Sequence, residues 1–337
     1  MVEMKELLRD VVGVGNAIVD VLAYGDDSLL ETLELTKGSM TLVDKERAHA
    51  IYSTMGETTE RSGGSVGNSV SALALLGASA SYIGKIGSDK LGQVFRNDLE
   101  NSGVSVEAIR SVDREGTGRC FVIVTSEGQR SMATHLGVCP DLKPDDIQID
   151  VIQNHKITYL EGYLWDLPDA KNALVRAAKY AHAAGRTVAL SLSDGFCVQR
   201  HRASFLELIE EHVDILFGNE EEIVTLYEAV DFDDAVAYAR RFSGIAALTR
   251  GEYGSLIIRG DETNMIDAAP VNRVVDTTGA GDLYASGVLF GITQGYDLHA
   301  CGKLGSMMAA EVIGYLGGRL GVDSLRRIKV FWNGLSW

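Results

Sequence analysis

The second half of the chain alternates regularly between two hydrophobic patterns. Short apolar runs bounded by turn residues, which are typical of buried strands, occur at 156–162, 186–193, 213–219 and 245–251. Between these runs, apolar residues recur every three or four positions, which predicts amphipathic helices at 168–185, 201–212, 220–229 and 232–244. Strands that alternate with helices indicate a mainly parallel sheet covered by helices on both faces.

The first half of the chain departs from this alternation. Residues 62–77 and 91–103 have helical spacing and end at Gly77 and Gly103, and residues 80–87 have the pattern of a strand. Alternating, strand-like segments predict a small separate β-sheet, with "SEGQ" (126–129) as the turn of a hairpin; these segments lie at about 16–24, 36–44 and 116–136. We expect this small sheet to be a lid inserted into one α/β domain that spans residues 1–337.

Composition narrows the class of partner. The chain has 337 residues and a net charge of −16, and an acidic field of this size disfavours nucleic acid and anionic lipid as partners. The four cysteines form no CxxC pair, which is typical of a reduced cytosolic protein. The first ten residues lack the apolar core of a signal peptide, and no apolar run is long enough to span a bilayer. We therefore expect a cytoplasmic protein that acts on small molecules, without a membrane partner.

The string "DTTGAGD", from Asp276 to Asp282, raises the most specific question of chemistry. If a helix begins at Gly279-Ala280-Gly281, its unpaired N–H groups form an anion site. Asp282 in the first helical turn cannot bind phosphate itself, but it could take a proton from an acceptor hydroxyl while the N–H groups hold a phosphoryl group. The plainer interpretation is a Gly-rich turn with Asp282 interacting with the helix dipole.

Three further strings lie where a turn meets an element. "SGGSVGN" leads into a helix and places the Asn68 amide near its start, where it could bind a ligand hydroxyl; taken alone, the string favours a structural turn. "GNEEE" ends a strand, so Asn219 and Glu222 share one face of the next helix and offer oxygen ligands for hydrated Mg²⁺, or simply cap that helix. "LTRGEYGS" follows another strand and could approach a nucleotide, with Arg250 facing phosphates, or form a hairpin turn.

Other motifs are missing. The sequence contains no GxxxxGK[ST], which excludes a P-loop enzyme, and "GVGNAI" lacks the third glycine of a dinucleotide fingerprint, which argues against an NAD oxidoreductase. Cys197 and His201 have a metal-like spacing but no partner pair for zinc.

With these motifs in place, the chain resembles the ribokinase-like (PfkB) kinase family. "SGGSVGNSVSALALLG" is similar to its N-terminal signature, "DTTGAGDLYASGVLFG" to its C-terminal one and "GNEEE" to its N-x-x-E element. The resemblance implies a three-layer α/β sandwich with a β-sheet lid, and phosphorylation of a hydroxyl by ATP with Mg²⁺. It implies that Asp282 is the general base and that Gly279, Ala280 and Gly281 form the anion hole. It also implies Asn219 and Glu222 as organisers of Mg²⁺, with Asp276 and Thr278 at a monovalent cation (K⁺) site that many members have.

Within the family, "GNAIVDV", "VDILFGNE" and "LSLSDGF" resemble stretches of adenosine kinases. This resemblance favours adenosine as acceptor and AMP as product, a purine-salvage reaction; the alternatives are a PfkB sugar kinase for ribose, fructose or 2-keto-3-deoxygluconate, and a non-catalytic nucleotide-binding protein. The implied acceptor-binding residues are Asn16, Asp20, Gly63, Gly64, Asn68, Arg119, Tyr163, Ser193 and Phe196. The implied ATP-binding residues are Asn219, Thr249, Arg250, Gly251, Gly254 and Thr278. The oligomeric state stays open between a monomer and a homodimer formed through the lid.

Overall fold

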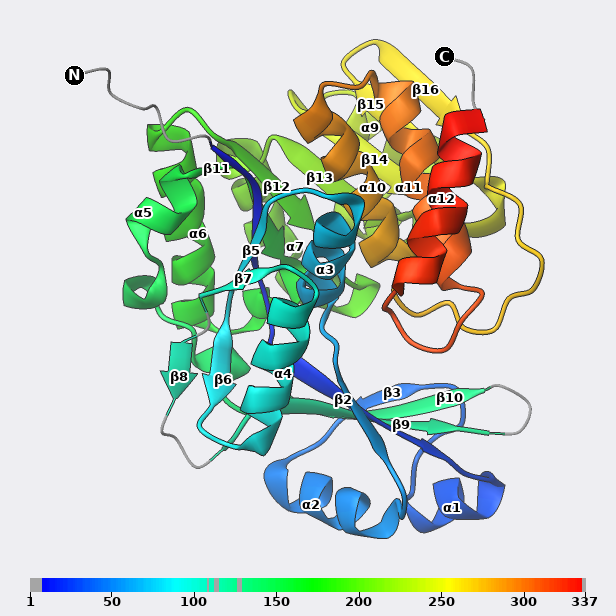
Figure 1. Ribbon diagram of the computed structural model, residues 1–337. Coiled ribbons are helices and arrows are strands. Elements are labelled where there is room, and N and C mark those ends of the chain that lie inside the picture. Colours follow the sequence, from blue (N-terminus) through cyan, green and yellow to red (C-terminus); the bar gives the residue numbers. More distant parts are fainter. Residues whose placement is uncertain (1–7, 108, 112–114, 126–128, 335–337) are drawn as a thin grey trace.

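The computed structural model describes residues 8–107, 109–111, 115–125 and 129–334. It contains a large sheet with helices on both faces and a small sheet that lies to one side of this body (Figure 1). The predicted mixed α/β fold with a mostly parallel main sheet and a second, smaller sheet is confirmed. Within the described residues, none of the helices combines the length and the apolar character that crossing a membrane requires.

The large sheet has nine strands in the order β16-β15-β14-β13-β12-β11-β1-β5-β7. All neighbours from β7 to β14 pair in parallel, while β15 and β16 form an antiparallel extension. The turn between β14 and β15 confirms the hairpin interpretation of "LTRGEYGS", although the sequence pattern did not predict the strands β15 and β16. The strands are β1 (Arg9–Val14), β5 (Ala80–Ile83), β7 (Ser105–Val106), β11 (His155–Glu161), β12 (Thr187–Ser191), β13 (Ile215–Asn219), β14 (Ile245–Thr249), β15 (Ser255–Arg259) and β16 (Glu262–Ile266).

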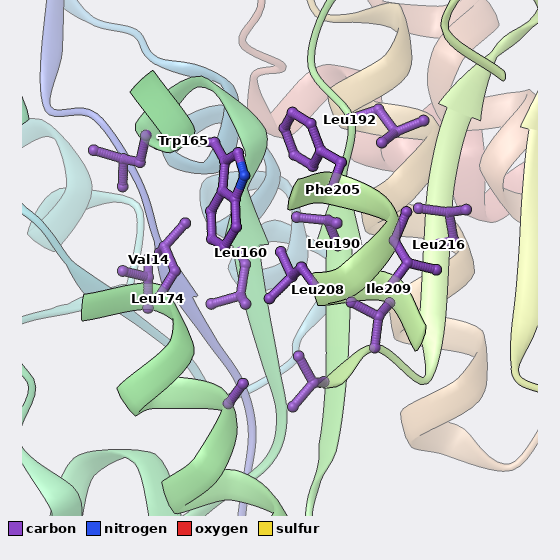
Figure 2. Packing of buried hydrophobic residues seen from close by; sticks show 14 of the residues in the cluster. Val14, Leu160, Trp165, Leu174, Leu190, Leu192, Phe205, Leu208, Ile209 and Leu216 are labelled. Atoms are coloured by element: carbon purple, nitrogen blue, oxygen red, sulfur yellow. The ribbon is translucent and has the colours of Figure 1, made fainter. Parts of the chain in front are cut away.

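Two groups of helices bury the two faces of this sheet. The first group packs over one apolar cluster and comprises α3 (Ser65–Leu76), α4 (Lys90–Asn101), α10 (Ala280–Gln294) and α11 (Leu298–Val312), with α12 (Val322–Gly334) against α11 and α3. The second group comprises α5 (Ile149–Gln153), α6 (Pro168–Ala183), α7 (Gly195–His212), α8 (Glu220–Tyr227) and α9 (Phe232–Ala239). Figure 2 shows the second core, where leucines of the strands meet Trp165 and Phe205, whose rings stack 5.6 Å apart. Short 3₁₀ turns complete the body at Cys139–Asp141, Pro144–Asp146, Gly162–Asp166 and Gly251–Tyr253.

The small sheet has the order β3-β10-β9-β2-β4, and its strands are β2 (Ile18–Tyr24), β3 (Met40–Leu42), β4 (Thr59–Ser62), β9 (Gly118–Val124) and β10 (Arg130–His135). Four of these strands lie in the segments that the sequence pattern indicated, and β4 was missed. The predicted turn residues 126–128 between β9 and β10 lie outside the described residues. Helices α1 (Asp27–Thr32) and α2 (Lys45–Thr54) cover the face of this sheet that points away from the body (Figure 1).

Several predicted boundaries need correction. The predicted strand at 80–87 is two strands, because β6 (Lys85–Gly87) leaves the large sheet and pairs with β8 (Ile109–Ser111). Helix α7 begins six residues before the predicted start, at Gly195, because the Asp194 side chain caps it by accepting a hydrogen bond from the Cys197 N–H. Helices α1 and α2 were not predicted, although Asp26 and Asp44 cap them in the same way.

Candidate active site

A cavity of about 770 Å³ lies between the small sheet and the carboxyl ends of the parallel strands. Glu161, Ser191, Asn219 and Thr249 end four adjacent strands, and all four line this cavity. The opposite wall comes from the small sheet and carries Ile18, Asp20, Met40, Leu42, Cys120, Met132 and Leu136. Ligands of open α/β sheets bind at this edge of the strands, so the cavity is the candidate active site.

The predicted anion site forms the start of α10, at one end of the cavity. Gly279 has a φ of 78°, which favours glycine, and a Cβ at this position would lie 2.6 Å from the Cα of Gly318. Gly281 is exposed at the cavity, and a Cβ there would meet no atom within 4 Å. The first N–H groups of a helix lack intrahelical acceptors, so the start of α10 offers donors to an anion in the cavity.

Asp282 lies in the first turn of α10 and is held by α3. Ser65 Oγ donates to its Oδ1 at 2.6 Å and Asn68 Nδ2 donates to its Oδ2 at 2.9 Å. The surrounding protein buries the carboxyl and raises its pKa to about 6, while these two hydrogen bonds and the charge of Arg319 act in the opposite direction. Burial is therefore the stronger effect, although the group is still mainly ionised at neutral pH. Asp282 therefore has the geometry and the ionisation that a general base requires.

Asp20 lies on β2 and faces the same cavity from the small sheet. Burial raises its pKa to about 6, because the charges of Arg130 and Arg319 lower the pKa only in part and Asp276 and Asp282 repel it. Gly63 has to be a glycine here, since a Cβ would lie within 2.6 Å of the Asp20 carboxylate. Asn16, Gly64 and Asn68, which the resemblance assigned to the acceptor site, line the same cavity as Asp20.

The sequence analysis missed Glu161, which is fully buried at the end of β11. Its carboxylate accepts hydrogen bonds from the backbone N–H of Asn16 (3.2 Å), the side-chain amide of Asn16 (2.7 Å) and the N–H of Val66 (3.0 Å). Burial raises its pKa to about 7, against the effect of these hydrogen bonds. Glu161 thus fixes Asn16 and the first turn of α3 beside Asp282. The only signal in the sequence was an acidic residue at the end of an apolar strand.

Asn219 and Glu222 form a reciprocal capping box at the start of α8, which is the plainer of the two interpretations of "GNEEE". Asn219 Oδ1 accepts from the Glu222 N–H at 2.9 Å, and Glu222 accepts from the backbone and side-chain N–H groups of Asn219 at 2.9 and 2.8 Å. Both residues also line the cavity. Burial, together with repulsion from Asp194, Glu221 and Asp282, raises the pKa of Glu222 to about 7. The described residues contain no group of three or more His, Cys, Asp and Glu side chains that could hold a metal ion by themselves.

Arg130 lies where we expected a monovalent cation. This arginine of β10 makes a buried ion pair with Asp276 at 2.8 Å, and its Nη1 also donates to Thr278 Oγ1 at 2.5 Å. The Asp276 carboxylate accepts further bonds from the N–H groups of Thr278 (3.0 Å) and Gly317 (2.7 Å). A guanidinium group therefore supplies the positive charge at Asp276, and the geometry does not support a K⁺ site at Asp276 and Thr278.

Arg119 does not lie at the cavity, so its assignment to the acceptor site is corrected. Its guanidinium lies 5.7 Å from the ring centroid of Phe121, which packs beneath α1 and α2 on the far face of the small sheet. Successive residues of a strand point to opposite faces, and the neighbouring Cys120 takes the face that lines the cavity.

The remaining predicted acceptor-binding and ATP-binding residues divide into those that line the cavity and those that do not. Tyr163, Ser193 and Phe196 line the cavity, and Phe196 is 72% exposed there. Thr249 also lines it, but Arg250, Gly251 and Gly254 do not. Glu220 accepts hydrogen bonds from the Arg250 guanidinium at 3.1 and 3.3 Å, which holds it away from the cavity.

Comparison with known proteins gives consistent matches. A sequence model of the pfkB family carbohydrate kinases matches residues 38–325. The crystal structure of adenosine kinase from Sinorhizobium meliloti is 46% identical and has a TM-score of 0.88, covering 96% of this chain and 99% of that chain. The crystal structure of a probable sugar kinase protein from Rhizobium etli is 43% identical, with a TM-score of 0.90 and the same coverage. An uncharacterized sugar kinase from Archaeoglobus fulgidus is 31% identical over 253 residues, which are 74% of this chain and 97% of that protein.

Proposed function

The chain belongs to the pfkB family of carbohydrate kinases and is a phosphotransferase with a hydroxyl group as acceptor, and from this premise we propose that it transfers the γ-phosphoryl group of ATP to the 5′-hydroxyl of adenosine to give AMP. One observation carries the proposal: the Asp282 carboxylate, held by Ser65 and Asn68, faces a cavity whose opposite wall is mainly apolar. A proton acceptor beside an anion site suits transfer to a hydroxyl, and an apolar wall suits a flat base.

Asp282 acts as the general base in this proposal. The 5′-oxygen attacks the γ-phosphorus, the bond from that phosphorus to the β,γ-bridging oxygen breaks, and ADP leaves with the electron pair. Asp282 takes the hydroxyl proton as the new oxygen–phosphorus bond forms. The N–H groups at the start of α10, which Gly279, Ala280 and Gly281 leave accessible, stabilise the charge on the transferred phosphoryl group.

The cavity favours a nucleoside over a simple sugar. Met40, Leu42, Met132 and Leu136 supply apolar surface from the small sheet, and Phe196 supplies an exposed aromatic ring from α7. A purine gains from such surface, whereas a sugar would leave it exposed to water. Asp20, on this wall near Asp282, accepts hydrogen bonds from the vicinal ribose hydroxyls in this proposal.

We propose Asn219 and Glu222 as the residues that would hold Mg²⁺. Both residues line the cavity, and a divalent cation would relieve the repulsion that Glu222 experiences from Asp194, Glu221 and Asp282. When bound, Mg²⁺ neutralises charge on the phosphates of ATP. Glu222 and Asn219 would hold it largely through water, because Mg²⁺ keeps several waters and the capping box already engages both side chains.

A sugar kinase is the second candidate, favoured by the similarity to the Rhizobium etli protein that is named a probable sugar kinase. The polar floor of the cavity, formed by Asn16, Asp20, Glu161 and Asn68, could bind sugar hydroxyls as well as ribose. The two candidates differ at the apolar wall, which only a nucleoside uses.

We also propose that the small sheet acts as the lid over a bound acceptor and excludes water from phosphoryl transfer. Because α1 and α2 cover the face of this sheet that points away from the cavity, a monomer is favoured over a dimer formed through that face. The cytoplasm, where ATP and adenosine are available, is the expected location.

The experiment is product analysis with purified protein, Mg-ATP and adenosine. We expect AMP and ADP to form in equal amounts, and both to form at least about 100-fold more slowly with the Asp282→Asn variant. ADP formation without AMP would show hydrolysis instead of transfer, and no reaction with adenosine alongside phosphorylation of ribose or fructose would favour the second candidate.

A further inference from the structure

Residues Gly317–Arg319, between α11 and α12, lie outside both signature motifs but contact the loop that forms the phosphate side of the cavity. The N–H of Gly317 donates to Asp276 Oδ2 at 2.7 Å. Gly318 packs against the positive-φ Gly279, at which a Cβ would lie 2.6 Å from the Cα of Gly318. The segment therefore supports the loop that leads into α10.

The same segment contacts the acceptor side of the cavity. A Cβ at Gly318 would lie 2.5 Å from Nδ2 of Asn68, the atom that donates to Asp282. Gly318 thus fills the space between Gly279 and Asn68, and no larger residue fits there without moving one of them.

The side chain of Arg319 extends this contact to the acceptor loop. Its Nε donates to the carbonyl oxygen of Ser62 at 3.2 Å, and its Nη2 to that of Gly63 at 3.5 Å. A Cβ at Gly67 in the first turn of α3 would lie 3.4 Å from the same Nη2. The guanidinium therefore binds the glycine turn at Ser62 and Gly63, and Gly63 in turn packs against the Asp20 carboxylate.

Arg319 also contributes charge where carboxylates gather. Its positive charge lowers the pKa values of Asp20 and Asp282, both of which burial raises to about 6. Burial lowers the pKa of Arg319 itself to about 10, so it remains protonated at neutral pH. Arg130 also lowers the pKa of Asp20, whereas Arg319 acts on both carboxylates.

We propose that Gly317–Arg319 is a positioning element that joins the phosphate loop to the acceptor loop, with Arg319 as the positioning residue for the acceptor and for the base. This inference rests on the proposed role of Asp282 as the base, but not on which hydroxyl compound is the acceptor. Arg319 does not touch the reacting atoms in this account; it acts through Ser62, Gly63 and the charge it presents to Asp282.

The first experiment compares Arg319→Gln with Arg326→Gln, a control at an arginine of α12 whose side chain is 80% exposed. We expect Arg319→Gln to raise the acceptor KM by about tenfold, the effect of losing one charged hydrogen bond. The KM for ATP should stay within about threefold of the wild-type value, which is less than the loss of one charged hydrogen bond produces. Calorimetric titration with the acceptor should show the same loss of affinity without relying on turnover.

The pH dependence of kcat/KM distinguishes a positioning role from a general loss of stability, because a loosened fold would not shift the pKa of Asp282 in a defined direction. The groups that face Asp282 are Ser65 and Asn68 from α3, Arg319, and the titratable side chains Asp20, Tyr159, Glu161, Tyr163 and Glu222. Among these titratable and charged groups Arg319 is the cation, so removing it should shift the acid limb of kcat/KM upward by about one pH unit. Arg319→Lys keeps a charge but loses the planar fork, so it should restore the pH profile and leave the acceptor KM raised. Arg319→Lys also serves if Arg319→Gln does not fold.

The second experiment uses two glycines of the same segment and its neighbourhood. Gly318→Ala places a methyl group 2.5 Å from Asn68 Nδ2, whereas a Cβ at Gly321 meets no atom within 4 Å. We expect Gly318→Ala to lower kcat by about tenfold or more through displacement of Asn68, and Gly321→Ala to retain wild-type kcat.

The outcomes separate this inference from the proposed function. If the wild-type protein phosphorylates ribose and not adenosine, the proposed acceptor is wrong, and the variants are measured with ribose. If Arg319→Gln and Arg319→Lys match Arg326→Gln in acceptor KM, acceptor affinity and pH profile, the positioning role of Arg319 is overturned, whatever the acceptor. Equal kcat values for Gly318→Ala and Gly321→Ala would overturn the contact between this segment and Asn68.

Discussion

The exchange of Asp282 for asparagine tests the proposed chemistry at a single atom. Asparagine keeps the size of the side chain and removes its ability to take a proton. General-base loss lowers turnover by roughly 10²- to 10⁴-fold, which corresponds to about 2.7–5.4 kcal/mol in the activation free energy. We expect a fall in kcat within this range.

The hydrogen bonds around Asp282 set the threshold for interpreting that fall. The carboxylate accepts from Ser65 Oγ and Asn68 Nδ2, whereas an asparagine has one acceptor oxygen and must turn its amide nitrogen toward one of these donors. Because these donors bind a carboxylate, loss of one such hydrogen bond costs about 1.5–3 kcal/mol, which accounts for a change of roughly 10- to 150-fold. A larger fall therefore requires loss of the proton acceptor as well.

The assay measures kcat together with calorimetric affinities for adenosine and ATP. Both affinities should change much less than kcat, because neither ground state depends on proton transfer. In the wild-type protein, kcat/KM should fall as the pH decreases through about 6, where Asp282 becomes protonated. A fall in kcat of less than about tenfold would refute Asp282 as the base, and an equal loss of both affinities would indicate that the α10 loop has collapsed.

Four further predictions follow from the same geometry. Asp20→Ala should raise the adenosine KM at least about tenfold through loss of charge-assisted hydrogen bonds, without changing the KM for ATP; unchanged adenosine kinetics would remove Asp20 from the site. Adenosine should slow amide hydrogen exchange in β3, β9 and β10 more than in the strands of the large sheet, and equal protection would contradict a lid. Because Arg130 supplies the positive charge at Asp276, replacing K⁺ by tetramethylammonium should leave kcat unchanged within error, whereas loss of turnover would restore the cation site. Leu190→Ala, at a fully buried position, should lower the free energy of unfolding by about 2–5 kcal/mol with little effect on KM; a smaller cost in chemical denaturation would show that the core relaxes around it.

The architecture of the large sheet was predictable because its strands are buried on both faces. Apolar runs such as 186–193 alternate with helical spacing, and this alternation corresponds to β11 through β14 with their covering helices. The antiparallel β15 and β16 follow β14 without an intervening α-helix. The apolar run of β15 is only three residues long (256–258), and β16 has no such run and is largely unburied, so the pattern did not mark either as a strand.

The residues at the cavity were predictable where chemistry and local geometry coincide in one short string. Gly279, Gly281 and Asp282 belong to one helix start, so their neighbourhood is fixed by the helix itself. Only the tertiary fold brings Glu161 to the cavity and Arg319 to the turn beside it, and neither residue lies in a string with a chemical signature of its own.

Arg119 and Arg130 show how strand register decides the outcome. They lie on two strands of one hairpin, and the sequence does not state which face of the small sheet each side chain takes. The observed register directs Arg119 toward Phe121 and Arg130 toward Asp276. A shift of one residue in either strand would exchange the faces, so only the folded structure distinguishes the two arginines.

The central claim, that this kinase acts on adenosine, is tested most directly by kcat/KM values for a panel of acceptors with Mg-ATP. The panel comprises adenosine, inosine, ribose, fructose and 2-keto-3-deoxygluconate. We predict the highest kcat/KM for adenosine, because only a nucleoside covers the apolar wall of Met40, Leu42 and Met132 while reaching Asp282. Efficient phosphorylation of ribose, fructose or 2-keto-3-deoxygluconate with no turnover of adenosine would contradict the claim.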